Sequence, residues 1–284
     1  MIILSFLWVV PALIPNKTLT ITFIDVGQGD ATLIQTPGKK NILIDAGLVK
    51  KDFRTGEVKY NMGKRTVAPL LKYYGINKLD MVITTHFDSD HVGGIPYILE
   101  NFRIGTLVDN GRSENYFPEY NDLRNKLKSR YIKAESGQIF AIDNDTELHI
   151  LYPIKDQAYD KKKNNNSIVA KLTYKNSSFL ITGDLERERE EELVHRYKDI
   201  LNVNLYKAGH HGSKTSSTSS FIDHVKPEIT VISCGRRNRY RHPHPSVIKR
   251  LRYTNSRLFR TDRGGAITCE SDGDSFQCFS FLKT

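Results

Sequence analysis

An α/β fold with one main domain is predicted from three features of the sequence. Short apolar segments with the character of strands alternate with helical stretches, as in layered α/β proteins. Several of these segments end at an Asp or a His, so one edge of the layers is expected to be polar. The 284 residues can bury a sizeable core within a single domain. The helical stretches are residues 67–74, 94–101, 121–130, 186–197 and 219–225.

The densest group of possible metal ligands follows the apolar run at residues 79–85. It places His86, Asp88, Asp90 and His91 within six residues. A loop at a strand end is free of the alternation of a strand, so it can turn all four side chains toward one point. His and Asp are common ligands of divalent metals. A metal site is therefore predicted here, and the alternative is a solvated acidic loop with two unrelated histidines.

Three further apolar strands end in the same types of side chain. Their terminal residues are Asp45, Asp184, and the neighbouring pair His210 and His211. Side chains at strand ends are well placed to form a site that the strands hold rigid. The four strand ends together predict one catalytic rim.

Six motifs occur in order along the chain. They are Asp25-Val26-Gly27-Gln28-Gly29-Asp30-Ala31, Ile44-Asp45-Ala46-Gly47, His86-x-Asp88-x-Asp90-His91, Thr182-Gly183-Asp184, His210-His211-Gly212-Ser213 and His242-Pro243. Together they resemble the metallo-β-lactamase-fold domain of the ComEC competence-protein family, over about residues 19–267. The resemblance implies an αββα sandwich with the metals at one edge. Asp88 stands where the wider superfamily usually has His, a variant that resembles the ComEC branch and bacterial phosphorylcholine esterases.

The resemblance also implies a ligand set for two divalent metal ions. The expected ligands are His86 and Asp88 for one ion, Asp90 and His91 for the other, Asp184 as the bridge, and His210 to complete the second site. A third ligand of the first ion is not evident between His91 and Asp184. The histidine in that interval, His149, lies in an apparent strand. A set of three His and three Asp is rich in oxygen, so manganese is expected beside zinc as the metal.

Other residues of these motifs are expected to assist the metals. Asp45 would hydrogen-bond a ligand histidine and fix its ring. Beside the catalytic ligands Asp90 and Asp184, either His211 or His242 would stabilise charge on the phosphate or protonate the leaving oxygen.

Two loops are candidates for contact with substrate. The backbone amides at residues 212–213 and the Ser213 hydroxyl could hold a phosphate. The serines and threonines of residues 213–218 can equally serve to cap a helix. Asp25 and Asp30 frame a loop with two glycines, which is either a tight connection between strands or a second contact with substrate.

The net charge of +10 is distributed unevenly. Residues 236–263 carry ten Lys or Arg against one acid, with aromatic side chains between them. A basic stretch beside a hydrolytic rim attracts polyanions, so DNA is the expected partner. The alternative is a solvated helix face over residues 246–252. The arginines expected to bind substrate directly flank His242 and are Arg236, Arg237, Arg239 and Arg241.

The N-terminal segment, residues 1–18, is distinguished from the hydrolase domain at residues 19–284. Residues 1–15 are apolar and uncharged. They are shorter than the roughly 20 apolar residues of a membrane span, and no basic residue precedes them as in a secretory signal. The segment is expected to be an export signal, an anchor or an edge strand, and an extracytoplasmic or membrane-associated location is favoured. No protein partner is predicted.

The three cysteines, Cys234, Cys269 and Cys278, lack the Cys-x-x-Cys spacing of a thiolate zinc site or a thioredoxin-like motif. They are expected to be core or near-surface thiols of C-terminal strands. A bridge between Cys269 and Cys278 across a hairpin is an option if the domain lies outside the cytoplasm.

The sequence and its resemblance predict a metal-dependent phosphodiesterase, specifically a nuclease that acts on DNA by two-metal hydrolysis during DNA uptake. One alternative is a hydrolase of a small or cell-surface phosphodiester, similar to the phosphorylcholine esterases. Another is a noncatalytic module that binds nucleic acid. Retention of all the ligand segments argues against the last option, because binding alone does not require a bridging carboxylate.

Overall fold

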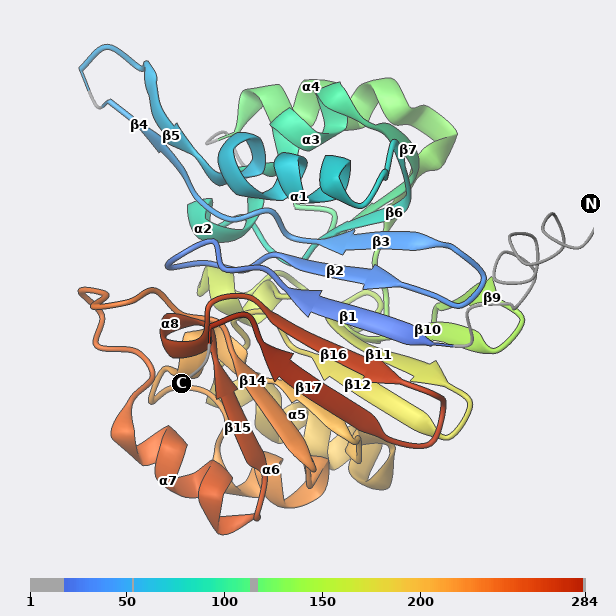
Figure 1. Ribbon diagram of the computed structural model, residues 1–284, viewed down its shortest axis with the longest axis vertical. Coiled ribbons are helices and arrows are strands. Elements are labelled where there is room, and N and C mark those ends of the chain that lie inside the picture. Colours follow the sequence, from blue (N-terminus) through green and yellow to red (C-terminus); the bar gives the residue numbers. More distant parts are fainter. Residues whose placement is uncertain (1–17, 53, 113–116, 283–284) are drawn as a thin grey trace, which may run out of the picture.

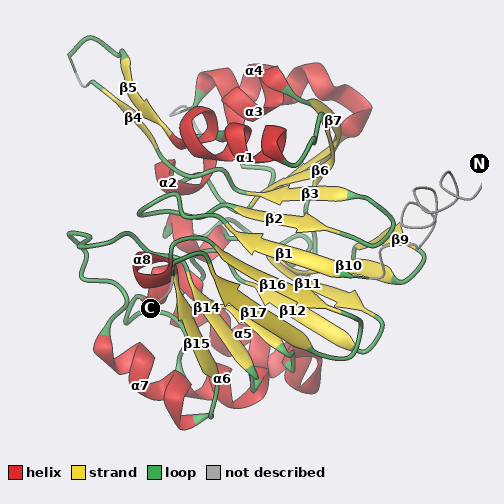
Figure 2. Cartoon of the chain, viewed as in Figure 1, coloured by secondary structure: helices red, strands yellow, loops and turns green. Residues whose placement is uncertain are grey.

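Two β-sheets packed face to face form the centre of the molecule, and helices cover their outer faces (Figure 1; Figure 2). The computed structural model describes residues 18–52, 54–112 and 117–282. The first sheet has the strand order β17-β16-β1-β2-β3-β6-β7-β8, and the second has the order β15-β14-β13-β12-β11-β10-β9. This arrangement is the αββα sandwich that the resemblance implied.

The strands of the first sheet are β1 (Leu19–Phe23), β2 (Thr32–Gln35), β3 (Asn41–Ile44), β6 (Lys78–Thr84), β7 (Arg103–Asp109), β8 (Tyr131–Lys133), β16 (Ile267–Ser271) and β17 (Phe276–Ser280). Those of the second are β9 (Ile139–Asp143), β10 (Thr146–Tyr152), β11 (Val169–Tyr174), β12 (Ser177–Ile181), β13 (Leu205–Lys207), β14 (Ile229–Ile232) and β15 (Arg257–Arg260). A separate hairpin, β4 (Val49–Lys51) and β5 (Val58–Asn61), projects from the body (Figure 1).

Helices α1 (Ala68–Tyr73), α3 (Ile95–Asn101) and α4 (Pro118–Leu127) pack on the outer face of the first sheet. Helices α5 (Arg187–Tyr197), α6 (Ser219–Val225) and α7 (Pro245–Tyr253) pack on that of the second. Two single-turn helices, α2 (Ser89–Val92) and α8 (Thr261–Gly264), complete the described helices of α type. Because helices cover one face and the partner sheet covers the other, central strands such as β6 are buried along most of their length.

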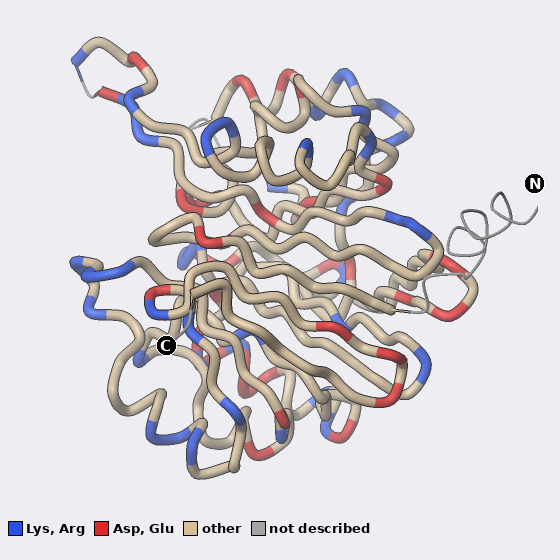
Figure 3. Tube along the Cα trace, in the orientation of Figure 1, with Lys and Arg blue, Asp and Glu red and all other residues tan. Residues whose placement is uncertain are grey.

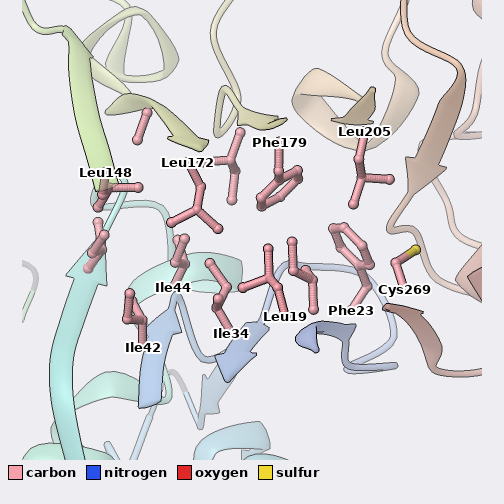
Figure 4. Close-up of a cluster of buried hydrophobic side chains, with 14 of the residues drawn as sticks. Leu19, Phe23, Ile34, Ile42, Ile44, Leu148, Leu172, Phe179, Leu205 and Cys269 are labelled. Atoms are coloured by element: carbon pink, nitrogen blue, oxygen red, sulfur yellow. The ribbon is translucent and has the colours of Figure 1, made fainter. Parts of the chain in front are cut away.

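The core between the sheets is made of apolar side chains from their inner faces (Figure 4). Phe23 of β1 meets Phe179 of β12 edge to face, with ring centroids 5.6 Å apart. Both rings are almost completely buried, and burial of such a side chain stabilises the fold by roughly 1.5–3 kcal/mol. This contact joins the two sheets beneath the edge that carries the metal-binding motifs.

The predicted helices are all present, with small shifts at their ends. The largest shift is at α4, which begins three residues before the predicted start, because Pro118 is suited to the first helical turn. Thr218 caps α6 by accepting a hydrogen bond from the Phe221 N–H. His149 lies inside β10, and its Nε2 is 2.9 Å from Glu147 Oε2. It is therefore a residue of the strand and not a metal ligand. His244 caps the N-terminus of α7.

The cysteines differ from the simplest expectation of three thiols. Cys269 and Cys278 are opposite each other in the β16–β17 pair and form a disulfide, whereas Cys234 is a buried thiol. The expected signal, anchor or edge strand at residues 1–15 lies outside the described residues. Within the described part of the chain, none of the helices has both the length and the apolar character needed to cross a bilayer.

Candidate metal centre

The metal-binding motifs meet at one edge of the sandwich, on the left side of Figure 1. Strands β3 and β6 run parallel in the first sheet, and β12, β13 and β14 run parallel in the second. The carboxyl ends of parallel neighbours lie at the same edge of a sheet, where open α/β sheets bind their ligands. Asp45 follows β3, the cluster at residues 86–91 follows β6, Asp184 follows β12, and His210 and His211 follow β13.

Three side chains converge at the centre of this edge. Asp184 Oδ1 lies 3.2 Å from His91 Nε2, and Asp184 Oδ2 lies 3.4 Å from His211 Nε2. The two imidazole Nε2 atoms are 3.3 Å apart. Ligand atoms of Asp30, His91, Asp184 and His211 all lie within 4.8 Å of one another, and all four side chains are buried. Such a cluster of buried carboxylates and imidazoles has the geometry and chemistry of a site for a divalent cation.

His86 and Asp88 lie beside this centre. His86 is buried, and its Nε2 has no hydrogen-bond partner among the described residues. Burial, followed by the neighbouring His91, lowers the pKa of His86 to about 3. Asp88 Oδ2 is 3.9 Å from His86 Nε2. A buried nitrogen that has no hydrogen-bond partner and lies near a carboxylate fits a further metal ligand beside the cluster.

Asp45 holds His91 in a fixed orientation. Asp45 Oδ2 is 2.8 Å from His91 Nδ1. The Thr85 N–H and hydroxyl donate to the two oxygens of Asp45 at 2.8 and 2.6 Å. With its Nδ1 proton held by this carboxylate, His91 presents the lone pair of Nε2 to the cluster centre. This is the bracing position predicted for Asp45.

The structure places the neighbouring histidines differently from the expected ligand set. His211 is buried, with Nδ1 3.0 Å from the Ser233 carbonyl and Nε2 3.3 Å from Asp90 Oδ2. His210 is partly exposed, and its Nε2 is 3.8 Å from Asp184 Oδ2. The geometry therefore favours His211 over His210 as the ligand of the second ion. Both residues have left-handed backbone, with φ of 48° and 54°, and this turn decides which ring points inward.

A buried ion pair beneath the centre was not predicted. Lys207 of β13 and Asp30 are both buried and contact each other directly. Asp30 Oδ1 is also 3.4 Å from His211 Nδ1. Burial would raise the pKa of the Asp30 carboxyl, but Lys207, followed by His211 and His91, holds it below its ordinary value. One signal was available in the sequence, because Lys207 is a lone charge within an apolar strand.

The segment between His91 and Asp184, in which no third ligand of the first ion was evident, contributes hydrogen bonds to the centre. The Ser167 hydroxyl accepts from the Asp184 N–H at 3.0 Å, which fixes the backbone of the expected bridging residue. Asn164 Nδ2 lies 3.4 Å from the His210 ring. The Asn166 side chain forms hydrogen bonds with backbone groups of residues 160–163.

The outer wall of the centre is the loop between β14 and α7. His242 stacks against His211, with ring centroids 6.4 Å and planes 29° apart. Burial, followed by His210 and His211, lowers the pKa of His242 to about 4. The Ser213 hydroxyl is nearly buried and lies 3.0 Å from the Thr215 hydroxyl. The four arginines of the predicted substrate-binding set are exposed on this loop, which carries a cluster of basic positions in Figure 3.

Comparison with known proteins agrees with this fold. The family model of the metallo-β-lactamase superfamily matches residues 24–236. The chain belongs to the metallo-β-lactamase superfamily. Among solved members of this fold, the chain is similar to YhfI from Bacillus subtilis, with a TM-score of 0.54, 14% identity, and coverage of 89% of this chain and 99% of that chain. It is also similar to CmlA, a diiron β-hydroxylase from Streptomyces venezuelae, with a TM-score of 0.55, 10% identity, and coverage of 88% and 53%.

Similarity in sequence extends to competence proteins. This superfamily member is 32% identical to ComE operon protein 3 of Bacillus subtilis over 258 residues. The matched region covers 87% of this chain and 32% of that protein. It is 31% identical over 257 residues to the competence protein ComA of Neisseria gonorrhoeae, with coverage of 90% and 33%. The chain thus spans about a third of the length of these relatives.

Proposed function

We propose that the chain is a metal-dependent phosphodiesterase that hydrolyses DNA. The observation that carries this proposal is the buried cluster of His91, Asp184 and His211, with the unpartnered His86 beside it. The basic loop at residues 236–241 lies on the outer wall of the cluster and supplies the attraction for a polyanion. Similarity to competence proteins supports DNA as the polymer, and the proposed biological setting is DNA uptake.

The residues of this centre have three roles in the proposed hydrolysis. Some would bind the ions, one orients a ligand histidine, and one would contact the substrate. His86, Asp88, Asp90, His91, Asp184 and His211 would hold the ions. When bound there, two divalent ions, zinc or manganese, would make a water molecule more acidic and neutralise charge on phosphoryl oxygens. Asp45 keeps Nε2 of His91 directed at the centre. His242 is half-buried on the outer wall and stacks against His211, so its imidazole would hydrogen-bond a phosphate oxygen at the rim.

Neutralising the four arginines of the basic loop tests the choice of substrate. We expect weaker binding of polymeric DNA by a variant in which four residues are changed to Gln, namely Arg236, Arg237, Arg239 and Arg241. Each phosphate contact releases counterions from the DNA, and this favourable contribution to binding is lost with the contact. The slope of log K against log[salt] should flatten by about 0.7 per contact for single strands or 0.9 for duplex DNA. Hydrolysis of a small chromogenic phosphodiester should persist in this variant. Both substrates are to be assayed with Mn²⁺ and with Zn²⁺.

Other outcomes of this assay would reject the DNA proposal. If the wild-type protein cleaves the small diester but no DNA with either metal, a small or cell-surface phosphodiester becomes the better substrate class. An unchanged DNA affinity and salt slope in the variant would mean that the loop is only a solvated surface. If neither substrate is cleaved although both ions are bound, the noncatalytic binding module would be the remaining reading.

We also propose that this domain acts outside the cytoplasm. The disulfide between Cys269 and Cys278 supports this location, because disulfides persist in oxidising compartments and are rare in the cytosol. Alkylation of protein isolated from its native cells, without reductant, should label Cys234 only after unfolding and should leave Cys269 and Cys278 unlabelled. Labelling of all three cysteines after unfolding would contradict an extracytoplasmic location.

A further inference from the structure

A groove of about 560 Å³ opens beside the metal centre. One wall comes from the base of the projecting β4–β5 hairpin, at Val49 and Lys50. The opposite wall comes from the basic loop, at Arg239 and Tyr240, and the candidate ligand Asp90 lies between them. A chain lying in this groove would therefore reach the ions at one end. No residue of the hairpin belongs to the six motifs, so this wall is outside the site described above.

Planar side chains form a ladder from the metal centre to this groove. His242 stacks on the candidate ligand His211. Tyr240 stacks on His242 in turn, with ring centroids 5.7 Å and planes 25° apart. The Arg239 guanidinium lies over the Tyr240 ring at 4.8 Å from its centroid. Tyr240 is nevertheless 51% exposed and Arg239 is exposed as well, so the outer end of the ladder is open to solvent.

The charges of the groove suit a phosphodiester backbone. Lys50 is exposed on the hairpin wall, and Arg239 is exposed on the facing wall. Lys51 is held by Glu119 at 2.9 Å, so its charge is already compensated. Basic positions appear on both the hairpin and the loop in Figure 3. Cations on two sides of a groove with an aromatic ladder at its wall are the elements of a site for single-stranded nucleic acid.

An unpaired strand fits this geometry better than a duplex. Bases in a duplex are stacked on each other, so an aromatic side chain at a groove wall cannot reach their faces without disrupting the stack. Bases of a single strand are free to stack on aromatic rings and on guanidinium planes. We propose that the groove binds a single-stranded stretch of polynucleotide, with one nucleobase stacked on the Tyr240–Arg239 end of the ladder and adjacent phosphates near Lys50. This inference rests on the proposed function, since it names the substrate form for the same centre.

The test compares two single strands that carry equal charge. Both are short, cleavage-resistant phosphorothioate oligonucleotides of the same length; one has all its bases, and the other has abasic sites throughout. Binding to the metal-loaded wild-type protein is followed by fluorescence anisotropy. We expect about tenfold tighter binding of the strand with bases, which is the size of effect that one base–aromatic stack provides.

Variants of exposed tyrosines identify the ring that binds. Tyr240→Ala should abolish the preference for bases, and Tyr240→Phe should keep it because the ring remains. Tyr253→Ala is the matched control, because Tyr253 is 80% exposed on α7 and does not line the groove, so the preference should be unchanged. Lys50→Gln should weaken both strands equally and flatten the salt dependence by about 0.7.

Equal affinity of the wild-type protein for the two strands would overturn the inference, as would an unchanged preference in Tyr240→Ala. Because binding is measured without cleavage, this result is separate from the test of the proposed function. A base preference that requires Tyr240 in a protein that cleaves no DNA would support the groove and reject the nuclease. Cleavage of DNA without any base preference would support the nuclease and reject the groove.

Discussion

Asp184→Asn is expected to retain the fold yet lose most hydrolysis and at least one bound metal ion. Asp184 is the carboxylate that faces both His91 and His211, so an amide in its place removes the negative charge that a bridging ligand supplies. Loss of residues that only orient metal ligands costs 10–100-fold in affinity or activity. Removal of the bridge itself should therefore lower kcat/KM by more than about 100-fold. Initial rates and metal content per protein, measured by mass spectrometry, check both effects.

Asp199→Asn provides the matched control for this substitution. Asp199 is exposed and follows α5, away from the edge that carries the centre. The same change of acid to amide there should leave rates, metal content and circular dichroism unchanged. Full metal content with unchanged activity in Asp184→Asn would remove this residue from the metal centre and with it the two-metal assignment.

The arrangement of the centre could be predicted because its parts follow a local rule. Asp45, His86 and Asp184 come one, two and three residues after strands that are buried along most of their length. A continuous apolar run shows where such a strand lies in the sequence, and the polar residues within the next few positions then lie at the sheet edge. The order and spacing of these motifs also carried the resemblance from which the αββα layers were expected.

The choice between His210 and His211 could not be predicted in the same way. The two residues are adjacent, and the direction of each ring depends on the left-handed backbone at both positions. L-residues enter this region rarely, and no residue type in the segment other than glycine marks it. The sequence therefore located the pair but could not say which imidazole faces the metals.

Contacts between distant segments were also beyond local rules. Lys207 and Asp30 are 177 residues apart, and only the packing of β13 against the loop after β1 brings them together. The Cys269–Cys278 bridge depends on the register of β16 and β17, which places these residues directly opposite each other. A one-residue slip in that register would have turned one sulfur to the other face of the sheet.

The ion pair of Lys207 and Asp30 leads to the second large expected effect. Lys207→Met keeps a long side chain but leaves the Asp30 carboxylate buried without its cation. Removing one partner of a buried ion pair typically costs about 3–5 kcal/mol, because the remaining charge is uncompensated. We expect a loss of this size in the free energy of unfolding, measured by urea denaturation of wild-type and variant proteins.

The double variant Lys207→Met with Asp30→Asn separates the buried charge from the loss of packing. If the uncompensated carboxylate causes the destabilisation, the added amide should recover most of it, since no buried charge then remains. Lys78→Met is the control for an exposed pair, because Lys78 lies 2.8 Å from Asp80 and its side chain is 57% exposed. That change should cost less than about 1 kcal/mol. Equal small losses in Lys207→Met and Lys78→Met would contradict a role for Lys207 in holding Asp30 beneath the metal centre.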